Sequence, residues 1–207
     1  MEYLKPEDIE NRSFEIIKSE LPYGLDPALE PVILRVIHTT ADFDYAGSVI
    51  ASHGAVEKAV SLLRSGVKII SDTNMIKAGV DKTRLYALNS GIECFSGDGD
   101  VAEAARQQGM TRARAAMDKA ASMNGPFIFA IGNAPTALLR IVELKTAGEY
   151  SPAFVIGVPV GFVNVTEAKE ALTRSGIPFI TALGRKGGST VAVAVCNALL
   201  RLAAPPC

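Results

Sequence analysis

The chain contains two histidines, His38 and His53, which are the side chains best suited to proton transfer near neutral pH. His38 ends an apolar helical pattern that we predict to begin with Asp26 as N-cap and Pro27 at the first helical position. The last turn of a helix favours a protonated imidazole, because the carbonyl end of the helix dipole is negative. His38 is therefore the candidate general acid. The alternative is a solvated histidine that only complements the dipole.

Arg35 lies three residues before His38, so a helix places both side chains on the same face. Its planar guanidinium can bind a carboxylate through two parallel hydrogen bonds. This pair predicts a proton donor next to a bound anionic group.

Three loops rich in Gly, Asn, Ser and Thr each lead from an apolar run into a predicted helix. They are Gly132–Thr136, Gly157–Asn164 and Gly184–Thr190. Backbone N–H groups at helix N-termini favour anions, and the third loop adds the cations Arg185 and Lys186. Ordinary turn chemistry is the alternative, and it explains one such loop more easily than three.

Other site chemistries find weaker support. The third loop lacks the Walker A order of Gly, Lys and Ser/Thr, and Gly97–Asp100 completes no GxGxxG, so a nucleotide site is not favoured. Asp42 and Asp44 have a single histidine nearby, and no metal site is predicted. No GxSxG motif is present, which argues against a hydrolase.

Five continuous apolar runs alternate with helical patterns. The predicted strands are Val67–Asp72, Gly91–Phe95, Pro126–Gly132, Pro152–Pro159 and Ile177–Gly184. The predicted helices between and after them are Ala55–Ser65, Val101–Met123, Thr136–Ala147, Thr166–Ser175 and Ser189–Leu202. This alternation predicts an α/β fold, a three-layer α/β/α arrangement with a mostly parallel five-stranded sheet. With no linker or repeat in the sequence, we predict one domain over residues 1–207, with the three loops at the carboxyl edge of the sheet.

Composition narrows the functional classes. The chain has 207 residues, 48% of them apolar, which suits a domain with a full core and a subunit interface. Its 21 basic and 22 acidic residues indicate no affinity for nucleic acid. No apolar run reaches membrane-span length, and the charged N-terminus does not resemble a secretory signal. Cys94, Cys196 and Cys207 match no disulfide or metal spacing, so we expect free thiols in a cytoplasmic protein, with a catalytic cysteine as a minor alternative.

Five segments, taken together and in this order, resemble those of the precorrin-8X methylmutase family across nearly the whole chain. They are Asn11–Ile17, Arg35–His38, Gly132–Leu138, Gly157–Val163 and Gly184–Ser189. The resemblance implies an isomerase of cobalamin biosynthesis that moves a methyl group from C11 to C12 of a corrin precursor by a 1,5-sigmatropic shift, giving hydrogenobyrinate or cobyrinate. It implies no cofactor, because any cobalt is carried by the tetrapyrrole substrate. It also implies a homodimer with the active site at its interface, and handover to neighbouring pathway enzymes.

The resemblance assigns roles to individual residues. The catalytic histidine of the family, a proton donor and acceptor, matches His38. Ser13 and Arg35 match substrate-binding positions, and Arg112 aligns with an arginine that the family uses. Ser13 as a helix cap and Arg112 as a solvated cation are the alternatives. On chemical grounds, the loop residues that fit the substrate carboxylates are Asn133, Gly161, Gly187, Gly188 and Ser189, while Phe162 and Val163 fit its apolar ring face.

Two choices stay open at this point. The substrate is either a metal-free precorrin or a cobalt-precorrin, and the run from His38 to Asp44 resembles the anaerobic, cobalt-using branch more closely. The alternative function, from another class, is a non-catalytic tetrapyrrole-binding carrier protein. A carrier needs no general acid in its pocket, so His38 favours the isomerase.

Overall fold

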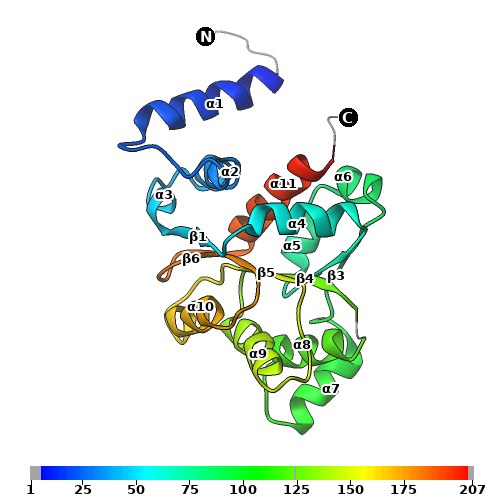
Figure 1. The fold of residues 1–207 in the computed structure, drawn as a ribbon. Helices are drawn as coiled ribbons and strands as arrows, with labels where there is room; N and C mark the ends of the chain where they lie inside the picture. Colours follow the sequence, from blue (N-terminus) through cyan, green and yellow to red (C-terminus); the bar gives the residue numbers. More distant parts are fainter. Residues whose placement is uncertain (1–5, 124, 205–207) are drawn as a thin grey trace.

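The computed structural model describes residues 6–123 and 125–204. A six-stranded sheet with strand order β1-β6-β5-β4-β2-β3 forms its centre (Figure 1). The strands are β1 Val49–Ala51, β2 Lys68–Ser71, β3 Ile92–Glu93, β4 Phe127–Ile131, β5 Phe154–Gly157 and β6 Phe179–Ala182. Neighbouring strands are parallel except for β1, which pairs antiparallel with β6. The mostly parallel α/β fold is confirmed.

The sheet has one strand more than the five expected. All five expected strands are present, and β1 is added at the edge, where Val49 pairs with Ala182 and Ala51 with Ile180. This strand has three residues and only Val49 is buried. So short and half-exposed a segment carries no continuous apolar run that a sequence pattern could reveal.

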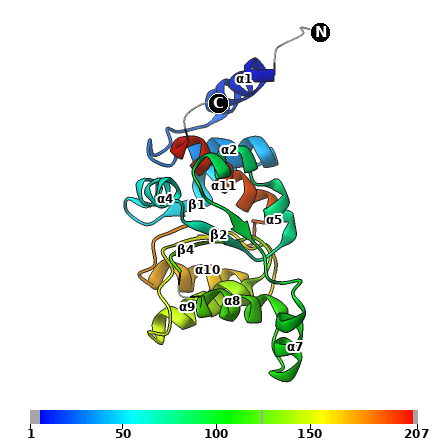
Figure 2. The ribbon, with the colours of Figure 1, turned by 90° about the vertical axis from the view of Figure 1, so that its right-hand side faces the viewer.

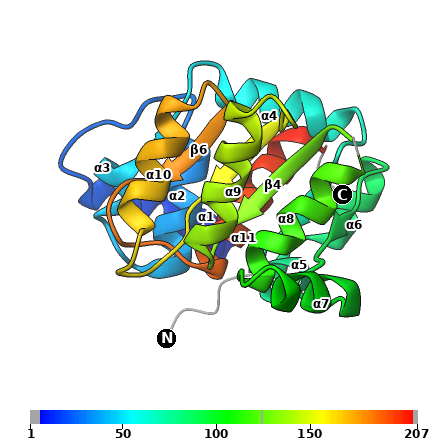
Figure 3. The same cartoon turned by 90° about the horizontal axis from the view of Figure 1, so that it is seen from below.

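Helices cover both faces of the sheet and make the three layers (Figure 1). On one face lie α2 Glu30–Thr40, α4 Ala55–Arg64, α5 Asn74–Gly79, α6 Lys82–Ala87 and α11 Ser189–Ala203. On the other lie α7 Gly99–Gln107, α8 Arg112–Ser122, α9 Pro135–Thr146 and α10 Val165–Arg174 (Figure 3). Alternate strand residues enter two separate cores: Ile69 and Ile156 face the first set of helices, while Ile70 and Val155 face the second.

Two helix boundaries differ from expectation. The helix that carries His38 begins at Glu30 rather than Pro27, because residues 27–29 form a turn in which the Asp26 carboxylate accepts from the Ala28 N–H at 3.0 Å. Its C-terminal end, with His38 in the last turn, is as predicted.

The single helix expected over Val101–Met123 is two helices. Gly109, with a φ of +64°, ends the segment after α7. Thr111 then caps α8, its hydroxyl oxygen accepting from the Arg114 N–H at 3.2 Å. A left-handed glycine followed by an N-cap threonine is a strong local break, even within a continuous apolar periodicity.

The first helix, α1 Pro6–Glu20, projects from the body of the molecule (Figure 2). Ile17 packs into the core beside α2, whereas Ile9 and Ile16 are 51% and 45% exposed. The short helix α3 Tyr45–Ser48 connects α2 to β1. None of the described helices is long and apolar enough to cross a membrane.

Candidate active site

Two of the glycine-rich loops pack directly against each other at the carboxyl edge of the sheet. The Gly188 N–H donates to the Val158 carbonyl at 2.9 Å, and the Gly161 N–H donates to the Arg185 carbonyl at 3.3 Å. A Cβ atom at Gly187 would stand 2.3 Å from the Val158 oxygen, so only glycine permits this approach. The loops after β5 and β6 therefore form one continuous surface.

The third loop, after β4, joins the same surface. A Cβ atom at Gly132 would lie 2.8 Å from the Cα atom of Ser189, the first residue of α11. The Ser189 hydroxyl lies 3.1 Å from the hydroxyl of Thr73, which follows β2. The sequence expectation that the loops gather at one edge is confirmed.

Asp72 occupies a place that the sequence analysis had assigned to a ligand. Its carboxylate, in a residue 3% exposed, accepts hydrogen bonds from the backbone N–H groups of Gly132, Asn133 and Ala134 at 3.0, 2.8 and 2.7 Å. The backbone of this loop thus binds the protein's own anion, and the expectation of a substrate anion there is wrong. Burial raises the pKa of Asp72, against the opposing effect of these three hydrogen bonds. The feature of the sequence that could have indicated a buried carboxylate is the position of Asp72 at the end of the apolar run Val67–Asp72.

Lys169, on α10, is a second buried charged residue that was not predicted from the sequence. The residue is fully buried, and its ammonium donates to the backbone carbonyls of Gly184 and Lys186 at 2.9 and 2.7 Å. Burial lowers the pKa of Lys169 to about 8. The signal was its place on the apolar stripe of α10, four residues after Val165 and three before Leu172.

Lys186 is paired within the protein rather than available to a ligand. Its ammonium lies 2.6 Å from carboxylate oxygens of both Asp42 and Asp44, which follow α2. Hydrogen bonds to these carboxylates raise the pKa of Lys186. The guanidinium of Arg185 stands 5.5 Å from the ring centroid of Phe162. The expectation of two cations free for substrate in this loop is therefore wrong for Lys186.

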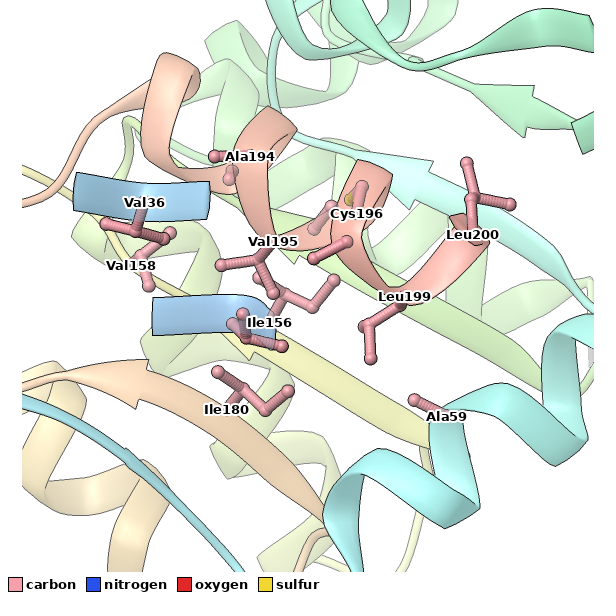
Figure 4. Close-up of a cluster of buried hydrophobic side chains, with 14 of the residues drawn as sticks. Val36, Ala59, Ile156, Val158, Ile180, Ala194, Val195, Cys196, Leu199 and Leu200 are labelled. Atoms are coloured by element: carbon pink, nitrogen blue, oxygen red, sulfur yellow. The ribbon is translucent and has the colours of Figure 1, made fainter. Parts of the chain in front are cut away.

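His38 lies exposed in the last turn of α2, four residues before Asp42, which pairs with Lys186 of the loop after β6. Val36, two residues earlier, packs beside Val158 at the end of β5 (Figure 4). The imidazole meets the ring of Phe14 edge-on, with centroids 5.5 Å apart and an interplanar angle of 77°. The imidazole therefore lies against α1, on the side of α2 that faces away from the buried Val36, and it is open to solvent.

Arg35 connects the same helix to α1. Its guanidinium pairs with Glu10 and lies 5.5 Å from the centroid of the Phe14 ring, and Arg201 binds Glu10 at 2.9 Å. Burial opposes ionisation of Glu10, but the two arginines outweigh it and lower the pKa of Glu10. Ser13, also on α1, donates its hydroxyl to the Ile9 carbonyl at 2.7 Å in mid-helix, so it is not a helix cap.

Arg112 begins α8, on the opposite face of the sheet from α2 (Figure 1). The neighbouring Thr111 hydroxyl lies 2.9 Å from that of Thr136 at the start of α9, which puts Arg112 near the loop after β4. Arg112 is exposed and borders a hollow of about 350 Å³. The structure therefore brings it to the carboxyl edge but not into the surroundings of His38.

Three further observations bear on the chemistry of the protein. Val160, Phe162 and Val163 are 45%, 82% and 76% exposed, an apolar surface beside polar loops. A larger hollow, of about 610 Å³, lies around His53 at the end of β1, which is the amino edge of the parallel strands. Within residues 6–123 and 125–204, no cluster of three or more His, Cys, Asp or Glu side chains could hold a metal ion.

Comparisons with known proteins agree over nearly the whole chain. The profile of the precorrin-8X methylmutase family matches residues 8–202. The cobalt-precorrin-8 methylmutase of Priestia megaterium is 43% identical over 97% of this chain and 89% of its own length. That of Salmonella typhimurium is 44% identical over 97% of both chains. A crystal structure of precorrin-8X methyl mutase from Thermus thermophilus superposes with a TM-score of 0.87 at 42% identity, over 95% of this chain and 96% of that one.

Proposed function

The chain belongs to the precorrin-8X methylmutase family and is an isomerase of cobalamin biosynthesis, and from this premise we propose that His38 is the general acid of the reaction. A non-catalytic carrier is not favoured, because the relatives are named as methylmutases. In the proposed reaction the methyl carbon leaves C11 and bonds to C12 of the same macrocycle. Atoms and electrons balance within the substrate, so no co-reactant is required.

The position of His38 carries this proposal. The imidazole stands in the last turn of α2 and is exposed to solvent, so it can reach a bound ligand and can both donate and accept a proton. His38 donates this proton to the ring system of the bound macrocycle and favours the tautomer from which the methyl group migrates. It takes the proton back after the shift, so the imidazole is regenerated in each turnover.

Substrate binding is proposed for the groups around this edge. Arg112, which is exposed, and Arg35, which keeps its pairing with Glu10, meet ring carboxylates as cations. The Ser13 hydroxyl and the exposed side-chain amide of Asn133 add neutral hydrogen bonds. The backbone at Gly161, Gly187 and Gly188 and the Ser189 side chain complete the polar contacts. The exposed surface of Phe162 and Val163 packs on the flat face of the ring, with Arg185 behind Phe162.

A homodimer with the site at its interface fits this distribution. The helices α8 and α2, which carry Arg112 and His38, lie on opposite faces of the sheet (Figure 1), and the projecting α1 exposes Ile9 and Ile16. A second copy covering α1 would remove these apolar side chains from water and bring basic residues of both chains to one macrocycle. Sedimentation equilibrium is expected to give twice the monomer mass of 21.8 kDa.

Cobalt-precorrin-8 is the proposed substrate, with cobalt carried by the ring and no cofactor held by the protein. The proposal is supported by the run from Thr39 to Asp44 and by the names of the two relatives. Turnover of cobalt-loaded and metal-free substrate under the same conditions tests it. A higher kcat/KM for the metal-free ring would contradict the choice.

The experiment on His38 uses the second histidine as a matched control. His38→Asn is expected to lower kcat by about 10²–10⁴, the usual contribution of general acid catalysis, with a KM close to that of the wild type. His53→Asn, at the opposite edge of the sheet, is expected to leave both constants unchanged. An undiminished kcat in His38→Asn would overturn the assignment.

A further inference from the structure

We propose that Lys169 is a positioning residue, which holds loop 184–188 in the shape that links the His38 end of α2 to the substrate-binding edge. The inference rests on the proposed role of His38. It concerns a side chain on α10 that forms no part of the proposed ligand contacts and lies wholly inside the protein.

The buried ammonium of Lys169 stabilises the conformation of loop 184–188. Fully buried lysines are rare, because the ammonium group loses its hydration, and here burial lowers the pKa to about 8. A methionine or leucine would fill the same place on the apolar stripe of α10 without that cost. What only the ammonium supplies is a pair of hydrogen bonds, at 2.9 and 2.7 Å, to the carbonyls of Gly184 and Lys186. Its contribution is therefore to the conformation of the loop.

A chain of contacts leads from this loop to Thr40, which lies two residues after His38 in the last turn of α2. The Lys186 whose carbonyl is held by Lys169 binds Asp42 and Asp44 through its side chain, at 2.6 Å each. The Asp42 N–H donates at 3.3 Å to the hydroxyl of Thr40, the last residue of α2. The orientation of the final turn of α2, and with it the His38 imidazole, is thus tied to the loop.

The same loop shapes the proposed binding surface. The Gly188 N–H donates to the Val158 carbonyl, and Gly187 lies so close to the same carbonyl oxygen that a Cβ atom would not fit. A loop released from Lys169 would shift both this surface and the Lys186 ion pairs. The reaction requires the imidazole and the bound ring to be in register, and a misplacement of about 1 Å can lower a rate about 100-fold.

The first test reads the position of His38 without any substrate. The chain has two histidines, so a proton–carbon NMR spectrum resolves them, and His53→Asn assigns the signals. Lys169→Met is expected to shift the His38 signal and leave that of His53 in place. The matched control is Arg174→Met, which removes an exposed cation from the same helix and is expected to move neither signal. An unmoved His38 signal in a folded Lys169→Met protein would overturn the proposal.

The second test is a double-mutant cycle on kcat/KM. Lys169→Met and Lys186→Met are each expected to lower kcat/KM by about 10- to 100-fold. Because both residues act through one chain of contacts, the kcat/KM of the double variant should be no lower than that of the more impaired single variant. Additive losses would show that Lys169 acts independently of Lys186 and would refute the proposal.

Further variants test the proposal if Lys169→Met is unstable. If Lys169→Met does not fold, Lys169→Gln is measured in its place, because its amide NH2 can still donate to a loop carbonyl. Lys186 is half-exposed, and Lys186→Met tests the contacts with Asp42 and Asp44 alone. An unchanged His38 signal in Lys186→Met would also contradict the inference. The NMR readout does not depend on catalysis, so an active His38→Asn enzyme would refute the proposed function and leave this test standing.

Discussion

The buried ammonium of Lys169 should leave a measurable mark on the pH dependence of stability. Its pKa falls from the ordinary 10.5 to about 8 in the folded protein. Between these two values the unfolded chain holds the proton that the folded chain has released. The unfolded state binds more protons in this window, so the free energy of unfolding contributed by Lys169 rises as the pH rises from about 8 to about 10.5.

The size of the effect follows from the same shift. One pKa unit corresponds to about 1.4 kcal/mol. Raising the pH across the whole window therefore raises the free energy of unfolding by about 3 kcal/mol. Between pH 7 and pH 9 only part of the window is crossed. Over that interval the wild type should gain roughly 1 kcal/mol from this group.

Urea unfolding at pH 7, 8 and 9 measures this gain, at one fixed protein concentration because an oligomer would otherwise change its apparent stability. The free energy of unfolding of the wild type should rise by roughly 1 kcal/mol more than that of Lys169→Met. Arg174→Met, on the same helix, should follow the wild type. Comparing variants cancels the titration of the other groups. Parallel curves for the wild type and Lys169→Met would refute the account of Lys169 as a buried, charged donor.

Three further outcomes follow from the site. Gly187→Ala should cost about 1–3 kcal/mol of unfolding free energy by urea titration, because its Cβ would meet the strand β5 end at 2.3 Å, whereas Gly91→Ala has open space and should stay within about 0.5 kcal/mol. Arg35→Lys should raise the Kd for product about tenfold in an absorption titration despite its retained charge, since one ammonium cannot serve Glu10 and a ring carboxylate as a planar fork does; an unchanged Kd would remove Arg35 from the binding site. Phe162→Ala should raise KM with little change in stability, because the side chain is 82% exposed without substrate; an unaltered KM would exclude its packing on the ring.

Local patterns predicted much of the site. The last turn of α2, which carries His38, and the three loops before α9, α10 and α11 follow from apolar periodicity and from glycines close in sequence. Parallel strands then bring those loops to one edge, whatever their separation along the chain. The boundaries that failed, at Glu30 and at Gly109, are places where a turn competes with a continuing helical pattern.

What could not be predicted depends on distant partners. Asp72 binds backbone groups 60 to 62 residues away, and Lys186 binds aspartates more than 140 residues away. A charged residue in a sequence is ordinarily expected to be solvated, because burial is tolerated only where such partners exist. Lys169 stood on an apolar stripe, yet its partners are carbonyls, which carry no sequence signature.

A single-turnover experiment tests the role of His38 most directly. Enzyme in excess is mixed rapidly with cobalt-precorrin-8, and the absorption change of the bound ring reports the methyl shift apart from product release. The account predicts that His38→Asn binds the ring as the wild type does and converts it about 10²–10⁴ times more slowly. Conversion at the wild-type rate in His38→Asn would contradict it.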